Sequence, residues 1–539
     1  MIPFFKKWMA QQTDGLTAAA FIVGASSLAS RLLGILRDRA LAGTFGAGSQ
    51  LDVYYAAFRM PDIAYNLVIL GAVSAGFIPV FTTWMEKDGK DAAMRLASRV
   101  LSAVGAVLAL CSVAIVAFAP LIVPLFAPGF SEAELALTVN LTRVMALSPI
   151  LLGLSAVIGG VMQAMRRFVG FALAPVFYNL GIIGGTVFLS PTFGVYGAAI
   201  GVVAGAFLHL IVQLSAAHDI PFWPFVKPNF ADPGMRRILM LMGPRIAALG
   251  VSQVSFTALI AIATITETGG VAVFNLANNI QSFPLGLFGI SFAIAAFPIL
   301  SRAAGNGDDE GYRKTLSAAG RRILFFVLPA TAIFFLLRAQ IVRVILGGGV
   351  FSWDDTIRVA DMLGIMALSL VAQSIVPLLM RALYARQDTW TPFKISLVSE
   401  SATIAAAWFL HGSFGLRGVG IAFSLGAFTQ ATLLLAVLRK RFGRLGKGET
   451  LYSFYRTTIA TVALCVVGFP MREWLGTIYP LETFWQVALQ AIGTVTFGGL
   501  AFLITAWLMR SSELEEIANG IRAKFIRRAK LAEGAEQAG

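Results

Sequence analysis

The stretch that decides the fold class runs from 168 to 218 and reads FVGFALAPVFYNLGIIGGTVFLSPTFGVYGAAIGVVAGAFLHLIVQLSAAH. It contains no Asp, Glu, Lys or Arg, and the flanking charges are Arg167 and Asp219. About 20 apolar residues cross a bilayer, so this run is long enough for two spans. Ser-Pro-Thr-Phe-Gly at 190–194 supplies a turn between them. The stretch therefore predicts a pair of transmembrane helices.

The composition of the whole chain agrees with a membrane protein. Of its 539 residues, 57% are hydrophobic and 13% are charged, against about 45–50% and about 25% in ordinary soluble domains. The mean hydropathy is +0.78. Three more charge-free windows lie at 100–131, 268–301 and 483–509. These values exclude a soluble globular protein and a disordered one. The two cysteines, Cys111 and Cys465, sit in apolar runs, which excludes a disulfide scaffold.

The apolar runs predict an all-α polytopic membrane protein with about fourteen transmembrane helices. Their approximate spans are 16–37, 53–83, 96–126, 137–164, 168–189, 195–216, 237–262, 271–301, 322–346, 359–384, 392–411, 416–438, 454–471 and 483–508. Basic clusters occupy alternate loops, so the positive-inside rule places both termini in the cytoplasm. This topology and anionic lipid headgroups explain the net charge of +14. The charge gives no support for nucleic-acid binding.

An internal repeat appears when the chain is shifted by about 220 residues. Met145-Ala146-Leu147-Ser148 then matches Met366-Ala367-Leu368-Ser369, and Gly194 and Gly197 match Gly415 and Gly418. Each copy holds six predicted helices, an even number, so the two copies run in parallel. We expect an N-lobe at 1–218, a C-lobe at 219–447, two added helices at 448–510 and a cytoplasmic tail at 511–539. Proteins of this design bind substrate between the lobes.

Charged residues in the first two predicted helices need an explanation, because a charge at mid-membrane costs about 2.5–3.5 kcal/mol. Arg31 and Asp38 are seven residues apart and share one helix face, as do Asp52 and Arg59. Arg37 lies beside Asp38. One interpretation is an arginine-lined cavity for an anion, since guanidinium groups bind phosphate oxygens bidentately. The other is a set of ion pairs near the membrane surface. Spacing leaves both open.

Two further charges also allow two interpretations. Arg245 follows Pro244 in the first helix of the C-lobe, where it faces the same cavity or extends to the cytoplasmic surface. Glu400 lies between Ser399 and Ser401 in a predicted span. It is either a site for a coupling cation or proton, or a protonated structural residue.

Several motifs for nucleotide binding, catalysis and metal binding are missing from the sequence. There is no phosphate-binding G-x-x-x-x-G-K-[ST] loop and no nucleophile motif. His209, His218 and His411 are scattered without metal-ligand spacing. We therefore expect a transporter rather than an enzyme, without cofactor or metal, and a monomer. The tail after 510 is expected to form an amphipathic helix on the inner leaflet.

The sequence resembles the MurJ (MviN) family of lipid II flippases, within the wider multidrug/oligosaccharidyl-lipid/polysaccharide exporter superfamily. The matching residues are Ser30-Arg31, Gly34, Arg37-Asp38, Phe45-Gly46-Ala47-Gly48, Asp52, Ala57-Phe58-Arg59-Met60-Pro61, Met242-Gly243-Pro244 and Arg386-Gln387-Asp388-Thr389-Trp390-Thr391-Pro392 with Lys394. The resemblance covers about residues 15–510 and includes the 6+6+2 arrangement of helices.

The resemblance implies a flippase of the bacterial cytoplasmic membrane. Its substrate would be an undecaprenyl-pyrophosphate-linked disaccharide-pentapeptide, moved from the inner to the outer leaflet for peptidoglycan assembly. Arg31 and Arg37 match family arginines expected to hold the pyrophosphate. Asp38 and Asp52 match acids thought to gate the cavity or orient those arginines. The two added helices would hold the lipid tail.

This chain also departs from the family pattern. Tyr65 and Asn279 stand where the family places cavity arginines, and Leu70 stands where it places a glutamate. Either Arg59 and Arg245 compensate, or the substrate differs. The alternatives are a flippase for another lipid-linked glycan, a cation-coupled drug exporter of the same fold, and a membrane glycosyltransferase or scaffold. Membrane potential, sodium and protons all stay open as the driving force.

Overall fold

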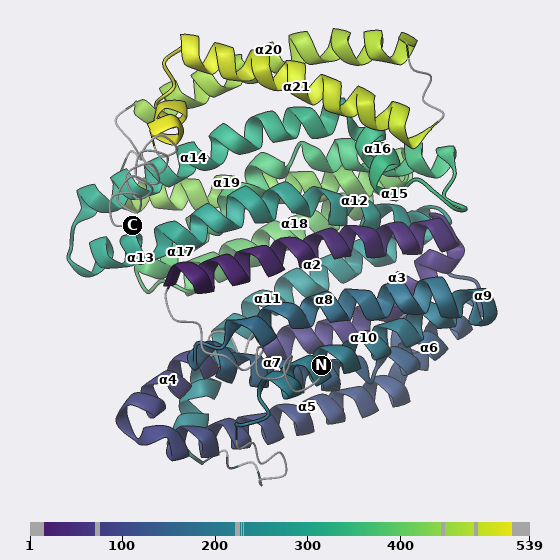
Figure 1. The fold of residues 1–539 in the computed structure, drawn as a ribbon, viewed down its shortest axis with the longest axis vertical. Coiled ribbons are helices and arrows are strands. Elements are labelled where there is room, and N and C mark those ends of the chain that lie inside the picture. Colours follow the sequence, from purple (N-terminus) through teal and green to yellow (C-terminus); the bar gives the residue numbers. More distant parts are fainter. Residues whose placement is uncertain are drawn as a thin grey trace, which may run out of the picture. The chain divides into compact units, whose positions relative to one another are not determined.

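The computed structural model describes residues 16–70, 76–220, 227, 229, 231–443, 448–478 and 483–519. Within these ranges the regular elements are helices (Figure 1), which confirms the all-helical fold class. In chain order they are α2 (Leu16–Phe45), α3 (Ser49–Tyr65), η1 (Asn66–Leu70), α4 (Ile78–Lys87), α5 (Gly89–Phe126), α6 (Glu132–Met145), α7 (Ser148–Ala164), α8 (Phe168–Gly184), η3 (Gly185–Leu189), α9 (Ser190–Phe193), α10 (Val195–Ala216), α11 (Pro233–Thr266), α12 (Gly270–Pro284), η4 (Leu285–Ile290), α13 (Ser291–Gly305), α14 (Asp309–Leu336), α15 (Arg338–Leu346), α16 (Trp353–Ala367), α17 (Leu370–Ala385), α18 (Trp390–Phe414), α19 (Leu416–Phe442), α20 (Glu449–Ile478) and α21 (Phe484–Leu508).

Among the described residues, eleven helices are long and apolar enough to cross a membrane. The pair α16 and α17, bent by 46°, makes a twelfth span if counted together. The two remaining predicted spans correspond to α2 and to the run α3, η1 and α4, which are helical over their described residues. The prediction of about fourteen helices is consistent with this arrangement.

Several predicted spans differ from the structure in their start or their continuity, among them those at 53–83, 322–346 and 359–384. The span predicted at 53–83 changes from α-helix to π-helix at 66–70. The span predicted at 322–346 begins earlier, at Asp309, because the Asp308 carboxylate accepts a hydrogen bond from Gly311 N and caps the helix before the apolar run starts. The span predicted at 359–384 breaks at 368–369, where Ser369 Oγ donates to Met366 O at 2.6 Å.

Internal contacts divide the chain into two compact units. Unit 1 comprises residues 1–276, 345–358 and 396–422, and unit 2 comprises 277–344, 359–395 and 423–539. The lobe boundaries expected from the sequence repeat remain a prediction.

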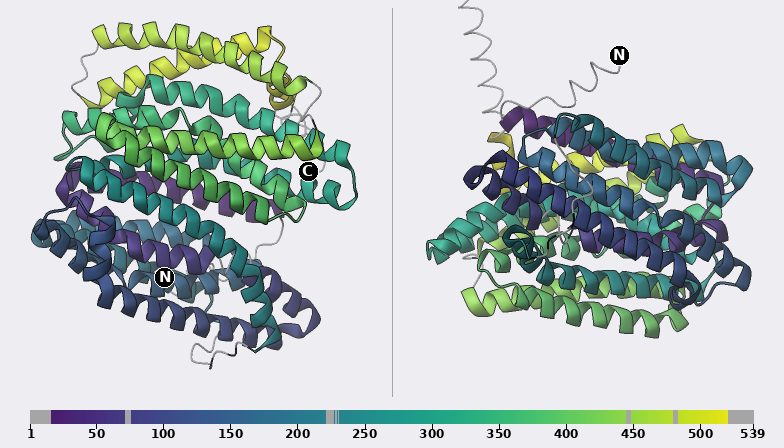
Figure 2. Two further views of the ribbon diagram at one scale, coloured as in Figure 1. Left: turned by 180° about the vertical axis from the view of Figure 1, so that it is seen from behind. Right: turned by 90° about the horizontal axis from the view of Figure 1, so that it is seen from below.

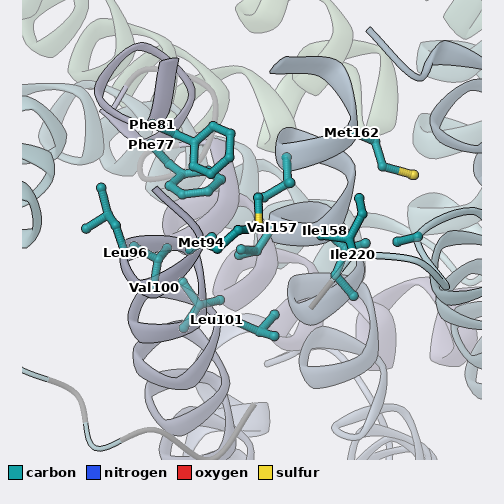
Figure 3. Close-up of a cluster of buried hydrophobic side chains, with 14 of the residues drawn as sticks. Phe77, Phe81, Met94, Leu96, Val100, Leu101, Val157, Ile158, Met162 and Ile220 are labelled. Carbon is teal, nitrogen blue, oxygen red and sulfur yellow. The ribbon is translucent and has the colours of Figure 1, made fainter. Parts of the chain in front are cut away.

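The core of unit 1 is a cluster of aliphatic, methionine and phenylalanine side chains (Figure 3). Phe77 and Phe81 are fully buried and pack with ring centroids 5.4 Å apart. Met162 from α7 and Leu101 from α5 belong to the same cluster. Tyr65, at the position of an expected family arginine, packs against this cluster.

The charge-free stretch 168–218 forms the predicted helix pair, α8 with η3 and then α10. A Cβ added at Gly181 would lie 2.2 Å from Gly205 Cα, and one at Gly185 would lie 2.3 Å from Gly201 Cα. Small residues at four-residue spacing let the two helix backbones touch, as in membrane helix pairs generally.

In unit 2, α20 and α21 run side by side (Figure 2) and α20 packs on α14. Phe325 of α14 contacts Phe502 of α21 with ring centroids 5.4 Å apart. Leu464 of α20 belongs to the same buried cluster. The two added helices are thus part of unit 2 through an apolar core.

The sequence repeat has a counterpart in local backbone geometry. Gly194 and Gly415 both have a left-handed conformation, with φ of 56° and 57°. The π-helices η1 and η4 begin 219 residues apart, at Asn66 and Leu285. Such unusual conformations at matching positions support a duplication.

Candidate functional site

Arg37 and Asp38 of α2 are the central residues of the candidate site in unit 1. The guanidinium of Arg37 donates to Asp38 Oδ1 from Nη2 at 2.8 Å and from Nε at 3.0 Å. Its Nη1 donates to Asn179 Oδ1 of α8 at 3.4 Å. Asp38 is 6% exposed, whereas the Arg37 side chain is 26% exposed. The arginine is therefore positioned by its neighbours and still accessible to a ligand.

The surroundings of this pair are aromatic and polar. Tyr54 and Tyr55 of α3 pack edge to face, 5.5 Å between ring centroids, and interact electrostatically with Arg37. The Tyr55 hydroxyl is buried and has no hydrogen-bond partner within the described part of the chain. Arg31, two turns earlier on α2, is exposed. These side chains can offer donors to an anion from α2 and α3.

Asp52 caps a helix from the other half of the repeat. It is 2% exposed, and its two carboxylate oxygens accept hydrogen bonds from Gly269 N at 2.6 Å and Ala272 N at 2.7 Å. Gly269 immediately precedes α12 and Ala272 lies in its first turn, where a negative charge is favourable. Asp52 is thus a link between α3 and α12, and both of its oxygens are already used.

A second link at the same end of unit 1 was not found from the sequence. Arg358 donates to Glu267 Oε1 at 2.7 Å, to Thr268 O at 2.6 Å and to Ala47 O at 3.2 Å. Both Glu267 and Arg358 lie in short polar segments between apolar runs, where charges are common. Composition alone therefore gave no reason to select them.

Arg59 is held between α3 and α11. It donates to Thr257 Oγ1 at 2.9 Å and to Gln253 at both its backbone and side-chain oxygens, at 2.7 and 2.6 Å. The guanidinium also stacks 4.8 Å from the Phe256 ring centroid and pairs with Asp62 at 3.4 Å. With 5% exposure, Arg59 holds two helices together in this state.

Glu400 of α18 lies against α11, where its carboxyl interacts with the Ser255 hydroxyl. The Ser255 Oγ is buried and lacks a hydrogen bond of standard geometry in the described residues. The backbone of Arg245 lies in α11, but its side chain is outside the described part of the structure. Glu400 and Ser255 together can bind a proton or a small cation.

Asn279 belongs to unit 2, in a helix segment rich in amides. Its backbone oxygen accepts from Ser282 Oγ at 2.7 Å. The adjacent Gln281 accepts from Gln373 Nε2 at 3.4 Å, and Gln373 donates to Ser369 Oγ at 2.7 Å. This part of α12 thus carries neutral amide side chains where the family pattern places an arginine.

The Arg386-Gln387-Asp388 motif shapes the connection between α17 and α18. Gln387 is left-handed, with φ of 59°. Arg386 pairs with Asp309 and lies over the Tyr312 ring, 4.7 Å from its centroid. Burial opposes ionisation of Asp388, but Thr391 and Arg441 outweigh it and keep the pKa of this carboxyl below its usual value. The motif thus organises a loop of unit 2.

No group of three or more His, Cys, Asp or Glu side chains is arranged to hold a metal among the residues that the structure describes. The available chemistry consists of guanidinium groups, a small number of carboxylates and neutral amides. Charged side chains on predicted membrane helices are typical of the solute or ion pathways of multi-span transporters. The chain shares its fold with a solved inward-facing multidrug resistance transporter of the MATE family, with a TM-score of 0.65 at 16% identity and with 79% of this chain and 98% of that one covered.

Sequence comparison identifies the particular family. The model of "Lipid II flippase MurJ" matches residues 41–487, so the chain belongs to the MurJ family. A probable lipid II flippase MurJ of Rhizobium tropici is 29% identical over 521 residues, with 94% of this chain and 95% of the relative covered. The lipid II flippase MurJ of Burkholderia cenocepacia is 28% identical, with 92% and 97% covered. A solved MurJ structure in an inward closed conformation has a TM-score of 0.74 at 21% identity, with 90% and 98% covered.

Proposed function

We propose that this protein moves lipid II, the undecaprenyl-pyrophosphate-linked peptidoglycan precursor, from the inner to the outer leaflet of the bacterial cytoplasmic membrane. The observation that carries the proposal is Arg37, an accessible arginine on α2, where the sequence predicts the first membrane span, positioned by Asp38 and Asn179. Membership of the MurJ family supports the same substrate.

The pyrophosphate group would bind at Arg37 and Arg31. Guanidinium groups remain charged in a dry site and present paired N–H donors to phosphate oxygens. Asp38 holds two N–H groups of Arg37, which fixes the plane of the guanidinium before the substrate arrives. Asp38 also balances the arginine charge when the site is empty, so the empty site does not leave an unpaired charge in the bilayer.

Transport would proceed by alternating access, with the contacts of Asp52 and Arg358 as the closure on one side. Asp52 bonds to the start of α12, and Arg358 bonds to 267–268 and to Ala47. Opening toward that side requires these hydrogen bonds to break together. Substrate bound at Arg37 would offset this cost if it binds the opened form more tightly.

Two further parts of the proposal are the driving force for transport and the membrane topology. The membrane potential can drive an anionic substrate outward, and Glu400 with Ser255 can bind a coupling sodium ion or proton. Both termini would be cytoplasmic, the protein would act as a monomer surrounded by membrane lipids, and no cofactor would be required.

A second candidate is a flippase for another undecaprenyl-linked glycan. Tyr65 packs against the core cluster of unit 1 and Asn279 is neutral, so two family arginines are missing from this chain. A substrate with fewer negative charges on its headgroup would need fewer arginines.

Complementation tests the proposal directly. The gene would be expressed in bacteria depleted of their own lipid II flippase, beside Arg37→Ala and Asp38→Ala variants at equal membrane levels. Rescue by the wild type and loss in both variants are expected. The matched control is Arg143→Ala, which removes an exposed arginine of α6 that donates to Val116 O. A correctly inserted wild type that does not rescue would favour the other glycans.

A further inference from the structure

An apolar groove of about 570 Å³ lies at the N-terminal end of α20. The residues lining it are Gly448, Leu451, Tyr452, Phe454, Tyr455 and Thr458. Leu451 is 75% exposed and Tyr455 is 57% exposed. Aromatic side chains at the end of a membrane helix characteristically lie at the level of lipid headgroups. The groove is therefore positioned to meet the part of a lipid where headgroup and acyl chains join.

An arginine stands at the edge of this groove. The Arg456 guanidinium lies over the Tyr452 ring, 4.0 Å from its centroid, and its Nη1 donates to Arg510 O at 2.6 Å. Its Nε is buried and has no acceptor in the described part of the chain. Arg456 is thus held in place by one aromatic ring and one carbonyl, and it carries a positive charge that no described carboxylate neutralises.

The second arginine, Arg510, is fixed at the same place by the turn that ends α21. Arg510 has a left-handed conformation, with φ of 52°, and Ser511 N closes the turn on Ala506 O at 2.9 Å. The chain then continues as a short helix at 512–519. Arg510 is exposed on this turn, so two arginines share one corner of unit 2.

A buried carboxylate holds the turn. Glu513 is 4% exposed and accepts hydrogen bonds from Ser453 Oγ at 2.8 Å and Ser511 Oγ at 3.0 Å. It also pairs with Arg321 of α14 at 3.3 Å. Burial opposes its ionisation, but these hydrogen bonds outweigh it and keep the pKa of Glu513 below its usual value. The corner is therefore anchored independently of any ligand.

We propose that this corner of unit 2 is a binding site for an anionic phospholipid of the inner leaflet. The lipid phosphate would bind at Arg456 and Arg510, and the glycerol and upper acyl chains would fill the groove beside Leu451 and Tyr455. Two positive charges next to an apolar groove match an anionic amphiphile. A zwitterionic lipid brings an ammonium group to the same corner and binds less well. The inference rests on the proposed cytoplasmic position of this end of α20, and it does not depend on lipid II as the substrate.

Native mass spectrometry of the purified full chain tests the site. The protein would be released from nanodiscs that contain phosphatidylglycerol and phosphatidylethanolamine, and the retained lipids would be identified and counted. We expect the wild type to retain one more phosphatidylglycerol than Arg456→Gln/Arg510→Gln, whose affinity for it falls about tenfold or more. The control is Arg236→Gln, an exposed arginine of α11 far from the groove in sequence, which should retain phosphatidylglycerol like the wild type.

Three outcomes would overturn the proposal. These are equal retention of phosphatidylglycerol by the double variant, equal retention of the two lipids by the wild type, and the same loss in the Arg236→Gln control. An Arg456→Lys/Arg510→Lys variant guards against misfolding, because it keeps both charges and should retain most of the binding. Lipid II transport is not measured here, so a negative result leaves the flippase proposal unaffected.

Discussion

Two helix contacts in unit 1 join equivalent pairs of helices in the sequence repeat but carry opposite chemistry. In the first, Arg37 of α2 meets Asn179 of α8. In the second, Ser255 of α11 meets Glu400 of α18. Asn179 and Glu400 are 221 residues apart, which is the offset of the repeat. The same step from Arg37 leads to Ala258, so the second copy has an alanine at the position of Arg37 and an acid at the position of Asn179.

In the function proposed above, this difference would separate substrate binding from ion coupling. A guanidinium in the first copy can bind a phosphate, and a carboxylate in the second can bind a proton or cation. A duplicated helix contact would thus provide two sites of opposite sign without a new fold. Variants that change only one copy test this division of tasks.

The largest effect is expected at Arg37. Arg37→Gln should abolish lipid II flipping at every sodium concentration and pH, because it removes the anion-binding charge. Glu400→Gln should keep a basal rate and lose only the dependence on the coupling ion. The measurement is lipid II flipping in proteoliposomes with imposed sodium, proton or potential gradients. Equal loss in both variants, independent of the gradient, would contradict the division of tasks.

A second pair of equivalent contacts reverses its charges outright. After α7, Arg167 pairs with Asp219, and after α17, Asp388 pairs with Arg441. The arginine is the buried partner in the first pair, at 11% exposure, and the aspartate is the less exposed partner in the second, at 20%. Both copies therefore keep an ion pair between these segments. Which segment supplies the arginine and which supplies the aspartate differs between the copies.

Arg167→Asp alone should lower the free energy of unfolding by about 1–3 kcal/mol, since it places two carboxylates together at a partly buried site. The exchanged variant Arg167→Asp/Asp219→Arg copies the polarity of the second pair and should recover most of the loss. Thermal unfolding of the detergent-solubilised protein measures both. No recovery in the exchanged variant would mean that the surroundings of Arg167 select the positive charge.

The sequence predicted the features that depend on composition and spacing. The charge-free stretch 168–218 gave the helix pair, and the Gly194/Gly415 match gave two turns of the same conformation. The Arg31, Arg37 and Asp38 pattern located a helix that carries charge inside unit 1. These succeed because hydropathy and glycine turns act locally along the chain.

Contacts between distant segments could not be predicted in this way. Spacing placed Asp52 and Arg59 on a common face, but only the fold shows Asp52 at the start of α12 and Arg59 bonded to Gln253. Glu267 and Arg358 are 91 residues apart and resembled ordinary loop charges. The break between α16 and α17 at Ser369 could not be predicted from hydropathy either. The Ser369 hydroxyl bonds to Met366 O, and one such residue does not change the apolar pattern of the segment.

A smaller effect is expected from pH. Hydrogen bonds from Arg167 hold the pKa of Asp219 below its usual value, and Asp388 is shifted in the same direction. A lowered carboxylate pKa stabilises the fold above the unfolded value of about 4 and loses that contribution as pH falls through the folded value. Both pairs should therefore weaken together in acid despite their reversed polarity. Each contributes less than about 1 kcal/mol, because one partner of each pair is nearly half exposed.

Melting temperatures of the wild type, Asp219→Asn and Asp388→Asn between neutral pH and about pH 3.5 measure this. The variants should be less stable than the wild type at neutral pH, and the difference should narrow as the pH falls toward about 3.5. A constant difference across the whole range would show that the two carboxylates contribute through packing rather than through charge.

The smallest effect on stability is expected at the turns that precede Arg167 and Asp388, the residues of the two ion pairs. Arg166 and Gln387 are both left-handed, with φ of 60° and 59°, and the next residue in each turn bonds back to the helix, Arg167 N to Met162 O and Asp388 N to Leu383 O. This backbone favours glycine.

Arg166→Gly and Gln387→Gly should each raise the free energy of unfolding by up to about 1 kcal/mol, by similar amounts, if the two turns are equivalent. Denaturation curves of the two variants compare them. A gain in one and a loss in the other would show that one of these side chains makes a stabilising contact, and the equivalence of the two copies would then end at the backbone.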